Sequence, residues 1–245
     1  MLTLFALLLF TLSPAAIADT ILRLPDVPAE TANESPSVLD EKQREVKASF
    51  PSDKQPRAGE EEILADYAHL DPERLVPNDL LRAAVLYFDA HQSSFANRKY
   101  LTVVDFSKRS NRARMFIVNL STGGVWAIRT THGKGGDLDH DGYVESLGNV
   151  PGSKKSSAGF YRVAEIYQSQ KFGRSIRLDG LSTSNSNVRS RAIVVHGSDY
   201  VQEADVIQGR SEGCFALAWS VKNEVVDRIA GGSLLYAAKS VACSQ

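Results

Sequence analysis

Short apolar runs, separated by polar or glycine-containing turns, dominate the chain from residue 98 to residue 240. The first is Tyr100–Phe106, and two more, Arg114–Leu120 and Val125–Thr131, flank the turn Ser121–Gly124. Runs of this length that are rich in β-branched and aromatic residues favour strands, and a glycine pair between two of them predicts a hairpin. Further strands are expected at Gly159–Tyr167, Ser175–Leu178, Ala192–His196 and Ser233–Ala237. Many short strands with few helices predict a mainly β fold, a β-sandwich of two packed sheets.

Helical spacing is confined to two parts of the chain. In Glu60–Asn97, acidic residues at 60–62 favour a helix start because carboxylates complement the positive end of the helix dipole. A second helix is expected to begin at Pro77–Asp79, after which apolar residues recur at helical spacing. Val221–Ile229 predicts a third helix, with Ser220 as its N-cap and glycines at 231 and 232 ending it. We therefore expect a helical segment at residues 60–97 that packs on a β domain spanning residues 98–240.

The first 18 residues form a separate apolar segment. Met1–Ala18 contains a compact apolar run and ends in Ala16-Ile17-Ala18, a small-x-small cleavage site, although no lysine or arginine precedes the run. We interpret it as a secretory signal peptide, which predicts export to the periplasm or cell envelope. An uncleaved membrane anchor is the alternative, but the run of about 12 residues is shorter than the ~20 that a spanning helix needs. We expect no membrane span after cleavage.

The next segment and the overall composition limit the remaining possibilities. Asp19–Gly59 holds many charges, repeated prolines and no sustained period, which is typical of a flexible linker, and residues 241–245 form a short tail. The chain has 43% hydrophobic residues and a net charge of −1. This composition allows one sizeable core and gives no reason to expect a nucleic-acid partner.

Candidate chemistry lies at two glycine-bounded positions late in the chain. The strand Ala192–His196 delivers a histidine to its end, just before Gly197, and a tight turn at Gly213 presents Cys214 ahead of an apolar run. A thiol is a nucleophile only as the thiolate, and an imidazole can take its proton and later return it to a leaving group. Backbone amides near Gly213 and Cys214 would then stabilise an oxyanion.

Two less functional interpretations of the same residues stay open. His196 and Cys214 are a core histidine and an inert buried cysteine in the first. In the second, Cys214 pairs with Cys243, because an exported chain with two cysteines invites a disulfide. We favour a free Cys214, because Cys243 lies close to the end of the chain in a polar tail.

The order of motifs resembles a known family. His196-Gly197, followed after a gap by Gly209-Arg210-Ser211-x-Gly213-Cys214, is similar to the active-site signature of the murein L,D-transpeptidases, a YkuD-like family. The resemblance also covers Tyr100–Ser107, Asn149–Val163 and Ser175–Leu181, and so spans roughly residues 75–240. It implies a β-sandwich with the cysteine at the edge of a cleft, and peptidoglycan stem peptides as substrate.

The resemblance also implies site residues and leaves one gap. It gives Cys214 and His196 as catalytic, with Ser211, Gly213 and Gly197 shaping the turn or the oxyanion site. Second-tier candidates for substrate binding are Arg210, His132, Ser156, Ser157 and Tyr161, and a satisfied structural histidine is the open alternative for His132. Many family members carry an arginine two positions after the cysteine, where this chain has Ala216. What holds the substrate carboxylate is therefore not predicted.

An acidic loop is a weaker chemical signal. Asp137, Asp139 and Asp141 alternate before Gly142, as in the first half of a calcium loop whose carboxylates converge on one hard cation. The match is incomplete, because position 12 is Gly148 rather than glutamate. A structural Ca²⁺ is the functional interpretation, and a solvated acidic turn is the alternative. We commit to no cofactor.

These residues predict acyl transfer through a thioester on Cys214, with His196 as the base. Resolution by an amine from a neighbouring stem would make the protein an L,D-transpeptidase. Resolution by water would make it an L,D-carboxypeptidase or another peptidoglycan hydrolase. A non-catalytic wall-binding domain is the remaining alternative.

Overall fold

The computed structural model describes residues 59–241, so the expected signal peptide, all but the last residue of the expected linker, and Cys243 lie outside the described part. The helices are α2 (Glu60–Asp66), α3 (Asn78–Ala90) and α4 (Trp219–Ile229), with short 3-10 turns at Gln92–Ser94, Lys134–Gly136 and Thr183–Asn185. The strands are β1 (Tyr100–Asp105), β2 (Met115–Asn119), β3 (Val125–Ile128), β4 (Gly159–Ser169), β5 (Gly173–Gly180), β6 (Val194–Gly197), β7 (Phe215–Leu217) and β8 (Ser233–Ala238). Within this range no helix is both long and apolar enough to cross a bilayer.

All eight strands belong to one sheet, in the order β3-β2-β1-β8-β4-β5-β6-β7. The pairs β1–β8 and β6–β7 are parallel and the other neighbours are antiparallel. Side chains from distant strands, such as Ile117 on β2, Leu178 on β5 and Val195 on β6, nevertheless meet in one buried core. The mainly β prediction is confirmed, with one difference. The two expected layers are the two halves of a single curled sheet, because the strand twist folds the sheet onto its own core.

The chain after β3 meets the far edge strand of the same sheet. The Thr131 amide donates to the Ala216 carbonyl at 3.2 Å, and the Ala216 amide donates to the Thr131 hydroxyl at 3.1 Å. The Thr130 hydroxyl also donates to the Ala216 carbonyl. The outer edge of β7 is therefore bonded, which removes an open strand edge and fixes the residues around β7.

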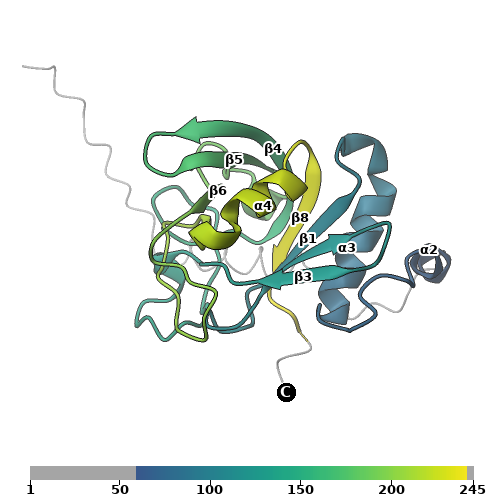
Figure 1. The fold of residues 1–245 in the computed structure, drawn as a ribbon, viewed down its shortest axis with the longest axis horizontal. Coiled ribbons are helices and arrows are strands. Elements are labelled where there is room, and N and C mark those ends of the chain that lie inside the picture. Colours follow the sequence, from purple (N-terminus) through teal and green to yellow (C-terminus); the bar gives the residue numbers. More distant parts are fainter. Residues whose placement is uncertain (1–58, 242–245) are drawn as a thin grey trace, which may run out of the picture. The chain divides into compact units, whose positions relative to one another are not determined.

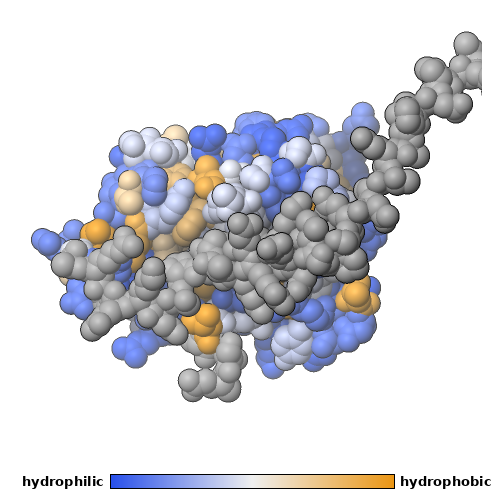
Figure 2. Space-filling model, turned by 180° about the vertical axis from the view of Figure 1, so that it is seen from behind, coloured by the Kyte–Doolittle hydropathy of each residue, from blue (hydrophilic) through white to orange (hydrophobic). Residues whose placement is uncertain are grey.

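Helices cover both faces of the sheet (Figure 1). Val225, Val226 and Ile229 of α4 join the core enclosed by the curl. On the opposite face, α3 buries Ala84 and Phe88 in a second core with residues of β1, β2 and β8. On the visible part of the face opposite to that of Figure 1, hydrophilic residues surround scattered hydrophobic ones (Figure 2).

Sequence patterns located most elements and missed two details. The helices in the 60–97 segment, the β2–β3 hairpin and the strands β1, β4, β5, β6 and β8 form where the pattern favours them. Helix α4 begins at Trp219, so Ser220 lies inside it and the predicted N-cap was wrong; Ala218 takes that place. The three-residue strand β7 was not predicted, because a run that short carries no period of its own.

Truncating the aromatic anchor of α3 tests its packing. Phe88 is buried and its ring lies 5.9 Å from that of Phe95, so Phe88→Ala should lower the free energy of unfolding by about 3–5 kcal/mol. Urea denaturation measures this change. The partly exposed Leu75→Ala is the matched control and should change stability by about 0.5 kcal/mol or less. Equal losses in the two variants would contradict the assigned role of α3.

Candidate active site

The pairing of β6 with β7 brings His196 and Cys214 to neighbouring positions. Val195 pairs with Phe215 and His196 with Ala216 in parallel register. Cys214 directly precedes β7, so continuing the register places it beside Val194. Residues two apart on a strand share a face, which puts His196 and Cys214 on one side of the sheet, one diagonal step apart. Standard strand dimensions give about 8 Å between their Cα atoms.

The His196 imidazole is buried and oriented. Its Nδ1 lies 2.9 Å from the Gly197 carbonyl oxygen, which can only accept, so Nδ1 carries the proton and Nε2 keeps its lone pair. Burial lowers the pKa of His196, and the nearby Lys171 lowers it further. The Phe172 ring stacks on the imidazole with 3.9 Å between centroids. The neutral, base-competent form is therefore favoured near neutral pH.

The Cys214 thiol is free and partly exposed. Its Sγ lies 3.7 Å from the Ala192 carbonyl oxygen, to which the thiol can donate. Burial of the sulfur raises the pKa of Cys214. A hydrogen bond from the Val194 amide and the charge of the Arg191 guanidinium act in the opposite direction and lower it. Across residues 59–241 no hydrogen bond joins the imidazole to the sulfur. The resting state is thus a protonated thiol beside a neutral imidazole.

The turn before Cys214 is shaped by its own hydrogen bonds. Gly213 has φ +120°, and a Cβ there would lie 2.7 Å from the Lys155 carbonyl oxygen. Only glycine fits this position. The neighbouring loop, rather than a substrate, is what excludes a side chain there. The Gly213 amide was expected to donate to an oxyanion. It instead donates to the Ser211 hydroxyl at 3.1 Å. Among the described residues the Cys214 amide has no partner, which leaves it as the donor at this turn.

Three second-tier residues support the turn from below instead of facing a substrate. Ser156, Ser157 and Tyr161 are all fully buried. The Ser156 hydroxyl donates to the Gly213 carbonyl at 3.1 Å and accepts from the Gly133 amide. The Tyr161 hydroxyl donates to the Ser157 carbonyl at 2.6 Å. Their printed contacts give them a structural role beneath the turn, and their contact with substrate stays a prediction.

The contacts of His132 are those of the structural alternative rather than of substrate binding. It is buried, its Nδ1 lies 2.7 Å from the Arg114 guanidinium, and its Nε2 lies 2.8 Å from the Asp137 carboxylate. A guanidinium only donates, so Nδ1 accepts and the ring is neutral with its proton on Nε2. Burial, followed by the Arg114 charge, lowers the pKa of His132 to about 4. The Ser211 amide donates to the His132 carbonyl, so this network supports the nucleophile turn.

The acidic loop gathers its carboxylates as the calcium-like spacing suggests. Asp137, Asp139, Asp141 and Glu145 each place one oxygen within 4.8 Å of the others. Asp137 is simultaneously bonded to His132, and the Asp141 amide donates to Asp137 at 3.1 Å. Arg210, a further second-tier candidate, donates to the backbone carbonyls of Asp137 and Leu138 rather than facing Cys214. These contacts account for the loop geometry without a cation.

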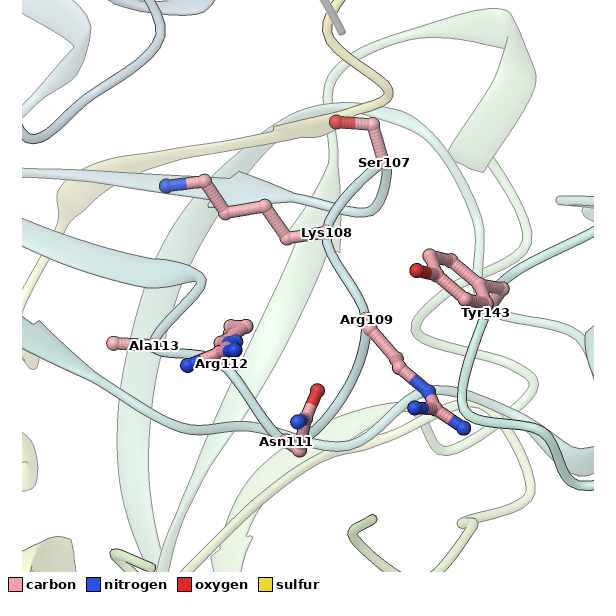
Figure 3. A pocket seen from close by; sticks show the side chains of 7 residues that line it. All are labelled: Ser107, Lys108, Arg109, Asn111, Arg112, Ala113 and Tyr143. Carbon is pink, nitrogen blue, oxygen red and sulfur yellow. The ribbon is translucent and has the colours of Figure 1, made fainter. Parts of the chain in front are cut away.

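A cavity of about 670 Å³ lies elsewhere, on the loop between β1 and β2 (Figure 3). It is lined by Ser107, Lys108, Arg109, Asn111, Arg112, Ala113 and Tyr143. None of these residues belongs to the group around His196 and Cys214. The cavity and the candidate site are therefore separate parts of the surface.

Sequence reasoning missed two residues that border the candidate dyad. Phe172, in the turn between β4 and β5, stacks on His196. Trp219 packs over Gly197, where a Cβ would lie 2.4 Å from its ring, and its indole donates to Asp199 at 2.7 Å. Neither had a local signal, because each is far from His196 in the chain and adjacent only after folding.

Comparison with known proteins identifies the family of this chain. The family model of the L,D-transpeptidase catalytic domain matches residues 73–238, which include His196 and Cys214. The match covers well over half of the sequence, so the chain belongs to this family, whose members act on peptidoglycan stem peptides. Among curated proteins none matches the chain.

Solved structures of L,D-transpeptidases match the chain at low identity and low TM-score. An enzyme from Mycobacterium smegmatis is 11% identical over 57% of this chain and 58% of its own, with a TM-score of 0.37. L,D-transpeptidase 3 from Mycobacterium tuberculosis is 11% identical over 58% of this chain and 61% of its own, with a TM-score of 0.38. A Xylanimonas cellulosilytica enzyme is 16% identical over 83% and 94%, with a TM-score of 0.35. This chain spans less than two thirds of both mycobacterial structures.

The buried neutral His132 predicts acid-sensitive stability. Its pKa lies at about 4 in the folded protein against 6.5 for the free group, so the unfolded chain binds more protons between these values. The stabilisation is present above pH 6.5 and is lost as the pH falls, by about 2 kcal/mol between pH 7 and pH 5. Urea unfolding of wild type and His132→Gln at both pH values measures it. Identical pH dependence in the two proteins would contradict the buried neutral state.

Proposed function

We propose that this protein is an exported cysteine acyltransferase, an L,D-transpeptidase that cross-links peptidoglycan stem peptides. The observation that carries the proposal is the placement of a free, partly exposed thiol and an oriented neutral imidazole on one face of the paired strands β6 and β7. Membership of the L,D-transpeptidase catalytic domain family supports the substrate class. Export rests on the sequence of Met1–Ala18 alone.

In the proposed reaction His196 Nε2 takes the thiol proton as the sulfur attacks a stem-peptide carbonyl. The bond between the carbonyl carbon and the sulfur forms, and the Cys214 amide, the donor left at the turn, faces the oxyanion. The intermediate collapses with loss of the terminal D-amino acid, whose nitrogen receives the proton from His196. An amine of a second stem then attacks the thioester, His196 Nε2 takes a proton from that amine, and the carbon–sulfur bond breaks as the proton passes to the sulfur.

The hydrogen bond to Gly197 explains how one imidazole performs both proton transfers. Because Nδ1 is held by a carbonyl, Nε2 alone exchanges protons with the sulfur and the leaving amine. When the ring is protonated, the same carbonyl stabilises the Nδ1–H. Burial of the sulfur raises the pKa of Cys214 and so favours the protonated thiol before a substrate carbonyl arrives.

Removing either reacting group tests the proposal. Cys214→Ala should abolish turnover of a disaccharide tetrapeptide, and His196→Gln should lower kcat by about 10²–10⁴-fold because proton transfer is lost. Mass spectrometry of the products, with and without an acceptor amine, separates cross-linking from hydrolysis. Release of tripeptide alone would identify an L,D-carboxypeptidase at the same site.

Cys243→Ser is the matched control. If Cys214 works as a free thiol, this variant should keep wild-type turnover. A loss of turnover in Cys243→Ser would indicate that the second cysteine is required. Full activity of Cys214→Ala would leave the family membership intact but would contradict the thiol mechanism.

A further inference from the structure

The side chain of Arg191 binds the loop that lies under the nucleophile turn. Its guanidinium donates to the Lys155 carbonyl at 2.6 Å, to the Ser157 hydroxyl at 2.8 Å and to the Gly148 carbonyl at 3.1 Å. A longer contact of 3.5 Å reaches the Ser153 hydroxyl. A planar fork of this kind holds several acceptors in fixed directions, which a lysine ammonium cannot reproduce.

This loop is in turn the support of Gly213. The Lys155 carbonyl accepts from Arg191 and also lies 2.7 Å from the position of a Gly213 Cβ. Ser156 donates to the Gly213 carbonyl. Arg191 itself approaches the turn, since one of its terminal nitrogens lies 3.4 Å from the same Cβ position. The guanidinium therefore stands beside the turn that presents Cys214.

The residue after Arg191 also faces the sulfur. Ala192 adopts φ +54°, a conformation that costs a non-glycine residue strain, and its carbonyl oxygen is the thiol's 3.7 Å neighbour. The strained bend directs this carbonyl toward Sγ while the Arg191 side chain contacts the loop on the other side of the turn. One short segment thus supplies both a hydrogen-bond acceptor for the thiol and a cation close to it.

We propose that Arg191 is a positioning residue for the nucleophile, which fixes the Cys214 turn through the 148–157 loop and favours the thiolate by its charge. The proposal rests on the proposed role of Cys214 as the attacking thiol. Ala216, two positions after the cysteine, is uncharged, so it supplies no cation to the turn. Here the positive charge comes from the segment before β6.

The other charged and titratable groups near the sulfur do not replace this cation. Glu212 precedes the turn and raises the pKa of Cys214, and it is itself paired with Lys134 at 2.9 Å and Lys154 at 3.6 Å. Tyr200 is uncharged near neutral pH, because burial raises the pKa of its phenol. His196 is neutral in the resting state, so Arg191 is the cation that lowers the pKa of Cys214.

Alkylation of Cys214 tests the proposal without requiring turnover. The full chain is treated with iodoacetamide between pH 6 and pH 10, and the tryptic peptide 211–222 is followed by mass, separately from peptide 240–245, which carries Cys243. In Arg191→Met the pH midpoint should move upward and the rate at neutral pH should fall about tenfold, since a nearby opposite charge stabilises the thiolate. Arg191→Lys should recover part of that rate because it keeps the charge.

Arg189→Met is the matched control, because Arg189 lies two residues away and pairs with Glu165 and Asp179 on the surface. It should alkylate as the wild type does. An unchanged pH midpoint in both Arg191 variants, with folding verified by circular dichroism, would overturn the proposal. An equal loss in Arg191→Met and Arg191→Lys would overturn the charge effect. A wild type that does not turn over the stem peptide, together with a shifted alkylation midpoint in Arg191→Met, would count against the proposed function alone.

Discussion

The parallel register between β6 and β7 is the constraint on which the candidate site depends. Cys214 and His196 are far apart in the sequence. The pairing of His196 with Ala216 is what places their two side chains on the same face. A slip of one residue would turn the side chain at position 214 to the opposite face of the sheet, because neighbouring strand positions face opposite sides. The short β7 therefore needs external support, and Thr130 and Thr131 supply it by bonding its outer edge.

Most polar residues around the site serve this register. His132, Ser156 and Ser211 are buried and bond backbone groups of the turn or of its neighbours, and none of them is placed to meet a ligand. A buried polar group without a partner is costly, so each satisfied contact favours one conformation of the turn over its alternatives. A nucleophile at a partly exposed strand end is in this way held by a rigid layer beneath it.

The sequence could predict strand β6, which carries His196, and the glycine turn before Cys214, but it could not predict strand β7. The β-branched run before His196 and the glycine before Cys214 are local signals, and both lie where the patterns indicated. It could not predict which polar residues are buried, so Tyr161 was a candidate for substrate binding and His132 was left open between substrate binding and a structural role. Burial depends on the curl of the sheet, which brings strands from its two halves around one core. Phe172, Trp219 and Arg191 became neighbours of the dyad through the same folding and carried no local pattern.

The central claim is that the thiol at Cys214 attacks a stem-peptide carbonyl, and the trapped acyl-enzyme tests it most directly. The full chain is mixed with a disaccharide tetrapeptide without acceptor, quenched in acid and digested, and the mass of peptide 211–222 is measured. The account predicts that this peptide gains the mass of the stem without its terminal D-amino acid, and that the gain disappears in His196→Gln at short times. An unmodified peptide 211–222 under conditions that consume substrate, or an acyl group found on another residue, would contradict it.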